Sequence, residues 1–123
     1  MLCIASAGAV VALAASSFTL GWTHSVERTE WLERWEVTPA GLQLFEASVE
    51  GSGAGIDLPA DAIWSDGRWT YHPQLPPLGS VTLAASGLTP GAWLLCADGY
   101  GCSPLGSEPE QPVRIWAAGT CTE

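Results

Sequence analysis

Apolar and polar residues alternate along most of the chain with a period close to two, which is typical of β-strands that bury one face. In residues 18–25, one face would carry Phe18, Leu20, Trp22 and His24, and the other face would carry Thr19, Gly21, Thr23 and Ser25. Further strands are expected over residues 2–7, 9–14, 42–50, 62–64, 69–72, 81–85, 92–96 and 113–117. The pattern predicts an all-β chain of about eight to ten short strands.

Residues 30–37 fit a helix as well as a strand. Glutamate recurs there at every third position, and Glu, Arg and Leu all favour helices. A strand would instead place Trp31 and Trp35 on one face, and the turn-forming residues 38–41 would end it. We expect a strand.

Turn signals separate the predicted strands. Asp66-Gly67 is a strong hairpin signal between two apolar segments. Residues 73–77 read as a proline-rich extended connection, and residues 103–112 as a loop rich in Pro, Gly and Glu. We therefore expect one domain over residues 1–123, built as a small antiparallel β-sandwich or barrel and stapled by disulfides.

The chain is acidic, with a formal net charge of -9, no lysine and four arginines. Residues 27–66 hold nine acidic residues against Arg28 and Arg34, a local net charge of -7. A nucleic-acid partner is not expected, because phosphate binding needs many basic residues. Docking on an anionic membrane surface is disfavoured for the same reason. The acidic stretch can attract cations or a basic partner, or it can simply be a solvated surface.

Four cysteines allow three disulfide pairings. Cys96 and Cys102 bracket a turn-rich loop, and Cys3 and Cys121 lie near the two termini, which are often close in a domain. We predict Cys96–Cys102 and Cys3–Cys121. Zinc is the competing interpretation, but the spacing of Cys96 and Cys102 is wider than zinc sites favour. We expect no metal or other cofactor, and an extracytoplasmic location because disulfides persist in oxidising compartments.

Residues 1–17 are small and apolar, as in a secretory signal peptide, and residues 12–14 offer an Ala-Leu-Ala cleavage site. However, no Lys or Arg precedes the apolar run, and the run is too short to span a bilayer. Cleavage after Ala14 would also remove Cys3. We interpret the segment as mature β-structure with a turn near Gly8, and expect an export signal or membrane anchor upstream of Met1.

Candidate chemistry gathers between Trp22 and Trp31. His24 and Ser25 are neighbours on a predicted strand and would face opposite ways, which disfavours a Ser–His nucleophilic pair. His24 can meet Glu27 or Glu30 across a bend, as a ligand site or an acid–base pair. Alternatively, His24 is a hydrogen-bonded structural residue and the glutamates are solvated. No catalytic residue is assigned.

A glycine-rich loop follows at residues 51–55, and Gly51, Ser52, Gly53 and Gly55 can present backbone N–H groups to a ligand. The loop lacks the lysine of a P-loop, so a plain turn is the favoured interpretation.

The chain also contains seven tryptophans, which can line a ligand groove or fill the core. They are Trp22, Trp31, Trp35, Trp64, Trp69, Trp93 and Trp116. We expect about five of them in the core, because large side chains fill small β-domains.

Several motifs are distinctive in combination. They are Phe18-x-Leu-x-Trp-Thr-His-Ser-Val-Glu27, Glu30-Trp31, Val37-Thr-Pro-x-Gly-Leu42, Glu46 followed by Gly-Ser-Gly-Ala-Gly at 51–55, Leu75-Pro-Pro-Leu78, Trp93-x-Leu-Cys96 and Cys102-x-Pro-Leu105. Over nearly its whole length the chain resembles the bacterial domain-of-unknown-function family 1850 (DUF 1850).

The resemblance implies a transport-associated context. Members of that family are small, are typically encoded beside or fused to components of TAXI-type TRAP transporters, and have no established activity. The resemblance implies no mechanism. Together with the disulfide-capable cysteines and the lack of a catalytic constellation, it leads us to expect a non-enzymatic, extracytoplasmic accessory or interaction domain that contacts the substrate-binding protein or the permease of a solute uptake system, or senses the solute. The alternative is a small-ligand or cation-binding module that uses His24, Ser25, Glu27, Glu30 and the 51–55 loop.

Overall fold

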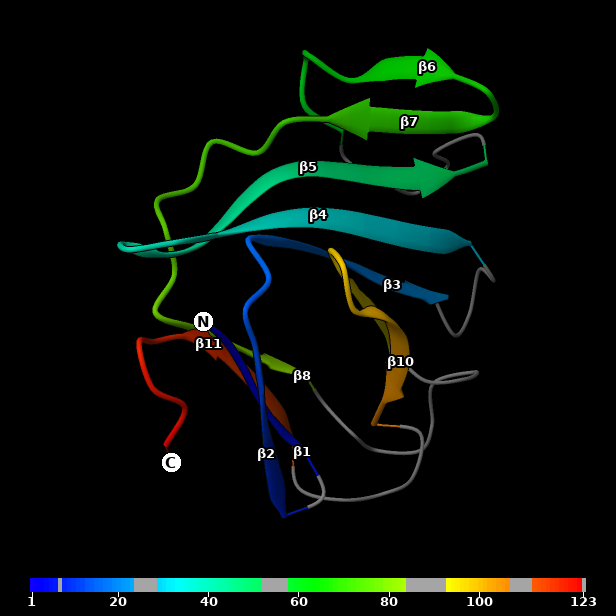
Figure 1. Ribbon diagram of the computed structural model, residues 1–123. Helices are drawn as coiled ribbons and strands as arrows, with labels where there is room; N and C mark the ends of the chain where they lie inside the picture. Colours follow the sequence, from blue (N-terminus) through cyan, green and yellow to red (C-terminus); the bar gives the residue numbers. More distant parts are fainter. Residues whose placement is uncertain (7, 24–28, 52–57, 84–92, 107–111, 123) are drawn as a thin grey trace.

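The computed structural model describes residues 1–6, 8–23, 29–51, 58–83, 93–106 and 112–122. These residues form eleven β-strands and no helix, so the predicted all-β class is confirmed. The strands build two antiparallel sheets that are not closed into a barrel (Figure 1).

The smaller sheet has the strand order β2-β1-β11-β8. It contains β1 (Leu2–Ser6), β2 (Ala9–Leu13), β8 (Ser80–Leu83) and β11 (Val113–Ala117). The larger sheet has the order β10-β9-β3-β4-β5-β7-β6. It contains β3 (Ser17–Thr23), β4 (Glu30–Thr38), β5 (Gly41–Glu50), β6 (Ile63–Ser65), β7 (Arg68–Tyr71), β9 (Trp93–Ala97) and β10 (Gly101–Leu105).

The core lies between the two sheets and follows the predicted alternation. Phe18 and Leu20 of β3 point inward and are buried, whereas Thr19 between them is only half-buried. They belong to one apolar cluster with Leu2 of β1 and Ile115 of β11. Each such side chain contributes about 1.5–3 kcal/mol when it is fully buried. Sequence alternation therefore locates the inner face of β3.

Residues 30–37 form a strand, as expected, and a bulge adjusts its pairing with β5. Arg34 lies opposite Glu46, but Trp35 lies opposite Leu44, so Phe45 is an extra residue without a partner in the register. The bulge shifts the alternation of β5 by one position. As a result, Leu42 and Leu44 before it and Ala47 and Val49 after it are all buried.

One predicted loop is wrong in part. The sequence predicts a loop over residues 103–112, but β10 extends to Leu105 and pairs with β9. Pro104 is tolerated because β10 is an edge strand, where a residue without an N–H group need not break the ladder. Cys102 therefore lies directly opposite Cys96 in the register.

The structure joins Cys96 to Cys102 and Cys3 to Cys121, the two pairs named from the sequence. The second bridge brings the chain ends together on the smaller sheet (Figure 1). There Cys3 packs with Trp116, and the N-terminal amine donates a 2.7 Å hydrogen bond to the carbonyl oxygen of Ala118. Two disulfides fit an oxidising, extracytoplasmic location.

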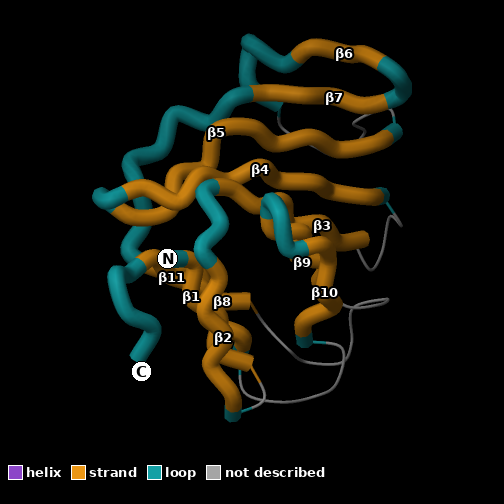
Figure 2. Tube along the Cα trace, viewed as in Figure 1, coloured by secondary structure: helices purple, strands orange, loops and turns teal. Residues whose placement is uncertain are grey.

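The expectation for the tryptophans is wrong. Only Trp35 and Trp116 are buried, at 3% and 6% exposure, and Trp64 is 49% exposed. The remaining four are half-buried. For Trp64 and Trp69 the reason is the unequal size of the sheets, because β6 and β7 of the larger sheet lie well away from the strands of the smaller one (Figure 2). A large aromatic residue on such a strand is only partly covered.

Candidate functional site: a groove over β3 and a tryptophan row

The outer face of the larger sheet carries a groove over β3. Ser17, Thr19 and Gly21 alternate with the core residues of β3, so its outward side chains are small. Larger side chains on the neighbouring strands, such as Leu32 on β4 and Leu94 on β9, flank them. The difference in side-chain size leaves a depression along the strand.

The groove has two parts that share Thr19 and Cys96. The first part has a volume of about 310 Å³ and is lined by Ser17, Phe18, Thr19, Arg34, Trp35, Phe45, Cys96, Ala97, Asp98 and Gly99. The second part has a volume of about 250 Å³ and is lined by Thr19, Gly21, Trp22, Thr23, Glu30, Leu32, Leu94 and Cys96. The shared residues make the groove continuous along β3.

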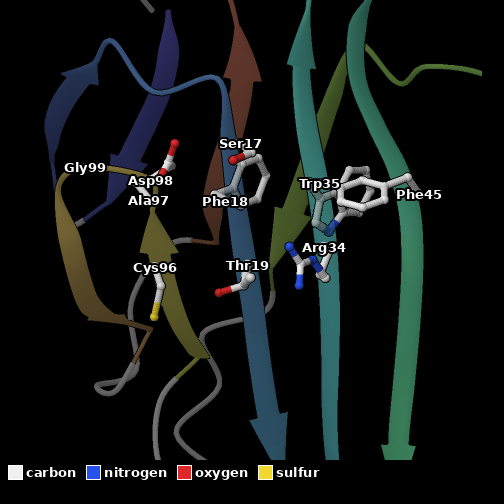
Figure 3. A pocket seen from close by; sticks show the side chains of 10 residues that line it. All are labelled: Ser17, Phe18, Thr19, Arg34, Trp35, Phe45, Cys96, Ala97, Asp98 and Gly99. Carbon is white, nitrogen blue, oxygen red and sulfur yellow. The ribbon is translucent and has the colours of Figure 1, made fainter. Parts of the chain in front are cut away.

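Figure 3 shows the first part, with Thr19 between Cys96 on one side and Arg34 and Phe45 on the other. The Arg34 guanidinium lies 5.7 Å from the centre of the Phe45 ring, a distance at which a cation is attracted to an aromatic face. Asp98 brings a negative charge to the same part of the groove. The groove thus combines an apolar wall with two opposite charges.

The lining offers several polar groups to a bound molecule. The described residues around the groove include the hydroxyl groups of Ser17 and Thr19 but no histidine, and Cys96 is held in a disulfide. Within the described part of the chain, no group of three or more His, Cys, Asp or Glu side chains is placed to hold a metal ion.

Glu30, a predicted site residue, is committed to the sheet. Its carboxylate forms a 3.1 Å ion pair with the Arg68 guanidinium, and its backbone N–H donates a 2.8 Å hydrogen bond to the Glu50 carboxylate. Arg68 Nε also donates to Ser48 Oγ at 3.2 Å. Glu30 therefore takes part in a network that ties β4, β5 and β7 together. The predicted site residues His24, Ser25 and Glu27 lie outside the described residues.

The glycine-rich loop is described only at Gly51. Its backbone N–H donates a 2.9 Å hydrogen bond to the carbonyl oxygen of Gly67, in the turn between β6 and β7. That N–H is therefore used within the fold. Ser52, Gly53 and Gly55 lie outside the described residues.

The inner face of the larger sheet holds a row of tryptophans that sequence reasoning missed. Trp31 of β4 lies opposite Trp22 of β3, with nearly parallel rings 6.1 Å apart. The Trp22 ring lies 4.9 Å from that of Trp93, and Trp69 lies opposite Trp64 with rings 5.4 Å apart. Val49 of β5 stands between the two groups, opposite both Trp31 and Trp69.

Glu33 and Tyr71 lie beside this row. Glu33 is two residues from Trp31 on β4, and Tyr71 is two residues from Trp69 on β7. Burial raises the pKa of the Glu33 carboxyl, an effect that a hydrogen bond from Trp35 partly offsets. Burial, together with the negative charge of Glu33, raises the pKa of Tyr71. Because side chains alternate along a strand, the sequence already predicts that Trp31 shares a strand face with Glu33, and Trp69 with Tyr71. Only the strand order shows that these two pairs lie on the same face of one sheet, separated by β5.

The fold and these surfaces define the class of the protein: an all-β domain of two open antiparallel sheets, with one disulfide at each sheet and a groove on the larger sheet. Residues 18–104 match the family described as Domain of unknown function (DUF1850), and the chain belongs to this family. No curated protein and no solved structure matches the chain. The described residues contain no helix long and apolar enough to cross a membrane.

Proposed function

We propose that this chain is a non-enzymatic accessory domain outside the bacterial cytoplasm that binds a protein component of a TAXI-type TRAP solute uptake system. The groove over β3 is the observation that carries the proposal. The setting rests on the gene context implied for the family and on the two disulfides, which suit the periplasm or the cell surface.

The groove has the properties of a protein-binding surface. Apolar side chains form its walls, including Leu94, which is half exposed, while Arg34 and Asp98 supply charges that fix the orientation of a partner. The Cys96–Cys102 bridge ties β9, which forms one rim, to its neighbour β10. A rigid rim lowers the ordering cost of association.

The chain's acidity favours a partner with a basic patch, because opposite charges accelerate encounter. The two natural candidates are the substrate-binding protein and the permease of the uptake system. A tagged chain should co-purify with one of them when it is expressed from its own gene neighbourhood. Clean absence from the transporter complex, together with normal solute uptake in a deletion strain, would contradict the proposal.

A groove-filling substitution tests the surface itself. Gly21→Leu places a side chain over β3, where a β-carbon meets only ordinary contacts with Leu32 and Trp31 at 3.5 and 3.6 Å. The variant should keep its melting temperature but lose the partner. Thr82→Leu, at an exposed position of β8 on the other sheet, is the matched control and should still bind.

The alternative function is a small-ligand or cation-binding module built from His24, Ser25, Glu27, Glu30 and the 51–55 loop. Two of its members, Glu30 and the Gly51 N–H, are already engaged within the sheet, which favours the accessory domain instead. Calorimetry that compares His24→Ala with the parent separates the two functions. The module requires a ligand or metal that the parent binds and the variant does not.

A further inference from the structure

Strand β2 lies at the edge of the smaller sheet and is apolar on both faces (Figure 1). It pairs with β1 on one side, and among the described residues no strand lies on its other side. Val11 lies opposite the core residue Ile4 and so points to the inner face of the sheet, whereas Val10 lies opposite Ala5 and points to the outer face. A strand that is apolar on both faces is normally buried on both faces.

Nevertheless, β2 is open to solvent. Residues 9–12 are all exposed, with Val10 at 37% and Val11 at 48% exposure. Only Leu13, at the end of the strand, packs against the core. The edge therefore presents unpaired backbone groups together with apolar side chains, which makes it a template for pairing with another strand.

The other edge strands carry features that hinder such pairing. β10 contains Pro104, which has no N–H group to donate. β6 is only three residues long. β8, at the opposite edge of the smaller sheet, carries the polar residues Ser80 and Thr82 on one face. Among the edge strands that the structure describes, β2 is the one that lacks a protecting residue.

The distribution of charge favours a second copy of this chain as the occupant of that edge. Each chain has a net charge of -9, so two copies repel each other wherever their acidic surfaces approach. Residues 27–66, which hold nine of the acidic residues, include β4, β5 and β6 of the larger sheet. By contrast, residues 1–23 contain no charged side chain. Two copies can therefore meet along β2 without placing like charges in the contact, and β2 offers no charge to a basic or acidic partner.

We propose that β2 pairs with β2 of a second copy of this chain, antiparallel and across a two-fold axis, so that the two smaller sheets join into one continuous sheet. Directly opposed residues point to the same face, so the residue on the axis, Val10 or Val11, faces its own copy. The contact closes after two chains because both copies use the same edge.

The dimer forms reversibly, because a strand of five residues gives only a short contact. Its dissociation constant is on the order of 10–100 µM. The contact does not involve the groove over β3, which lies on the larger sheet. The proposal therefore stands or falls independently of the proposed function.

Sedimentation velocity of the whole chain, at concentrations below and above that range, tests the proposal. The chain should pass from monomer to dimer, and added salt should strengthen the dimer because it screens the repulsion between two acidic chains. Val10→Lys and Val11→Lys should each weaken the dimer about tenfold or more, because each places an ammonium group in the apolar contact. Ile63→Lys makes the same change of charge at an exposed residue of the β6 edge and should dimerise like the parent.

Hydrogen exchange on the parent locates the contact without any variant. The amide hydrogens of β2 that point away from β1 should exchange more slowly in the dimer, while those of β6 should not change. A parent that stays monomeric at every concentration, a dimer without this protection, or a dimer that is lost in Ile63→Lys but kept in both valine variants would overturn the proposal. Adsorption of a monomeric parent to neutral phosphatidylcholine vesicles would overturn it as well, and would assign the apolar edge to a lipid surface.

Discussion

Trp35 Nε1 donates a 3.1 Å hydrogen bond to Glu33 Oε1, two residues earlier on the same face of β4. The bond connects the buried core to the tryptophan row, because Trp35 stacks on Phe18 while Glu33 lies two residues from Trp31 on the same face of β4. The carboxylate is oriented by this donor but still suffers from burial, which raises its pKa above the ordinary value of 4.5. The ionised form of Glu33 therefore lowers the free energy of unfolding.

The pH dependence of Glu33→Gln follows from that cost. The folded chain holds the Glu33 proton more tightly than the unfolded chain, so this residue lowers the unfolding free energy as pH rises above 4.5. The amide that replaces the carboxyl group stays neutral, and its oxygen still accepts the Trp35 hydrogen bond. We expect Glu33→Gln to be more stable than the parent at pH 7 and similar at pH 3.

Denaturant unfolding at both pH values measures this difference. Tyr71, the other titratable group known to interact with Glu33, stays neutral throughout because its own pKa is raised above 10.0. Glu36→Gln on the exposed face controls for the change in net charge. A stabilisation by Glu33→Gln that is the same at pH 3 and pH 7 would contradict the assignment.

Gly41 is required by the approach of the 72–78 connection to β5. Leu42 and Leu78 exchange two backbone hydrogen bonds of 2.8 Å, and a β-carbon on Gly41 would collide with the Leu78 carbonyl oxygen. Gly41 also has a φ of +127°. We expect Gly41→Ala to lower the unfolding free energy by about 2 kcal/mol. Gly79→Ala, where nothing lies within 4 Å, should change it little.

The two disulfides should differ in their effect on stability. The Cys3–Cys121 bridge spans 118 residues and the Cys96–Cys102 bridge spans 6. In the chain-entropy model, removing the long bridge costs about 5 kcal/mol and removing the short one about 2 kcal/mol. Unfolding of the Cys3→Ala/Cys121→Ala and Cys96→Ala/Cys102→Ala double variants measures both costs. Equal losses would show that native packing, rather than loop length, sets the effect.

Arg68 should be more important than a surface ion pair usually is. Its guanidinium reaches the Glu30 carboxylate and backbone oxygen as well as Ser48 Oγ, so it ties β7 to two other strands. Arg68→Lys keeps the charge but loses the forked geometry, and we expect a loss of about 1 kcal/mol. Glu30→Gln, which leaves most of these contacts in place, should cost less. If both variants unfold like the parent, the network contributes no stability.

Local sequence signals account for much of the fold. The Asp66-Gly67 turn forms as predicted, with φ angles of +53° and +77° that a two-residue hairpin turn of this type requires. Gly8 takes a φ of +79° between β1 and β2, where the sequence places a turn. Period-two alternation identifies Phe18 and Leu20 as core residues. These signals can be recognised in the sequence because each depends only on residues that are close together along the chain.

The two candidate surfaces depend on tertiary structure. The sequence alone determined the all-β class, most strand positions and a reasonable disulfide pairing, since period, turn chemistry and cysteine placement are local or depend on the ends of the chain. Only the strand order brought Trp31 and Glu33 within two strands of Trp69 and Tyr71, and only the register placed the Phe45 bulge. Strand order and register arise from contacts between residues far apart in sequence, which no local pattern encodes.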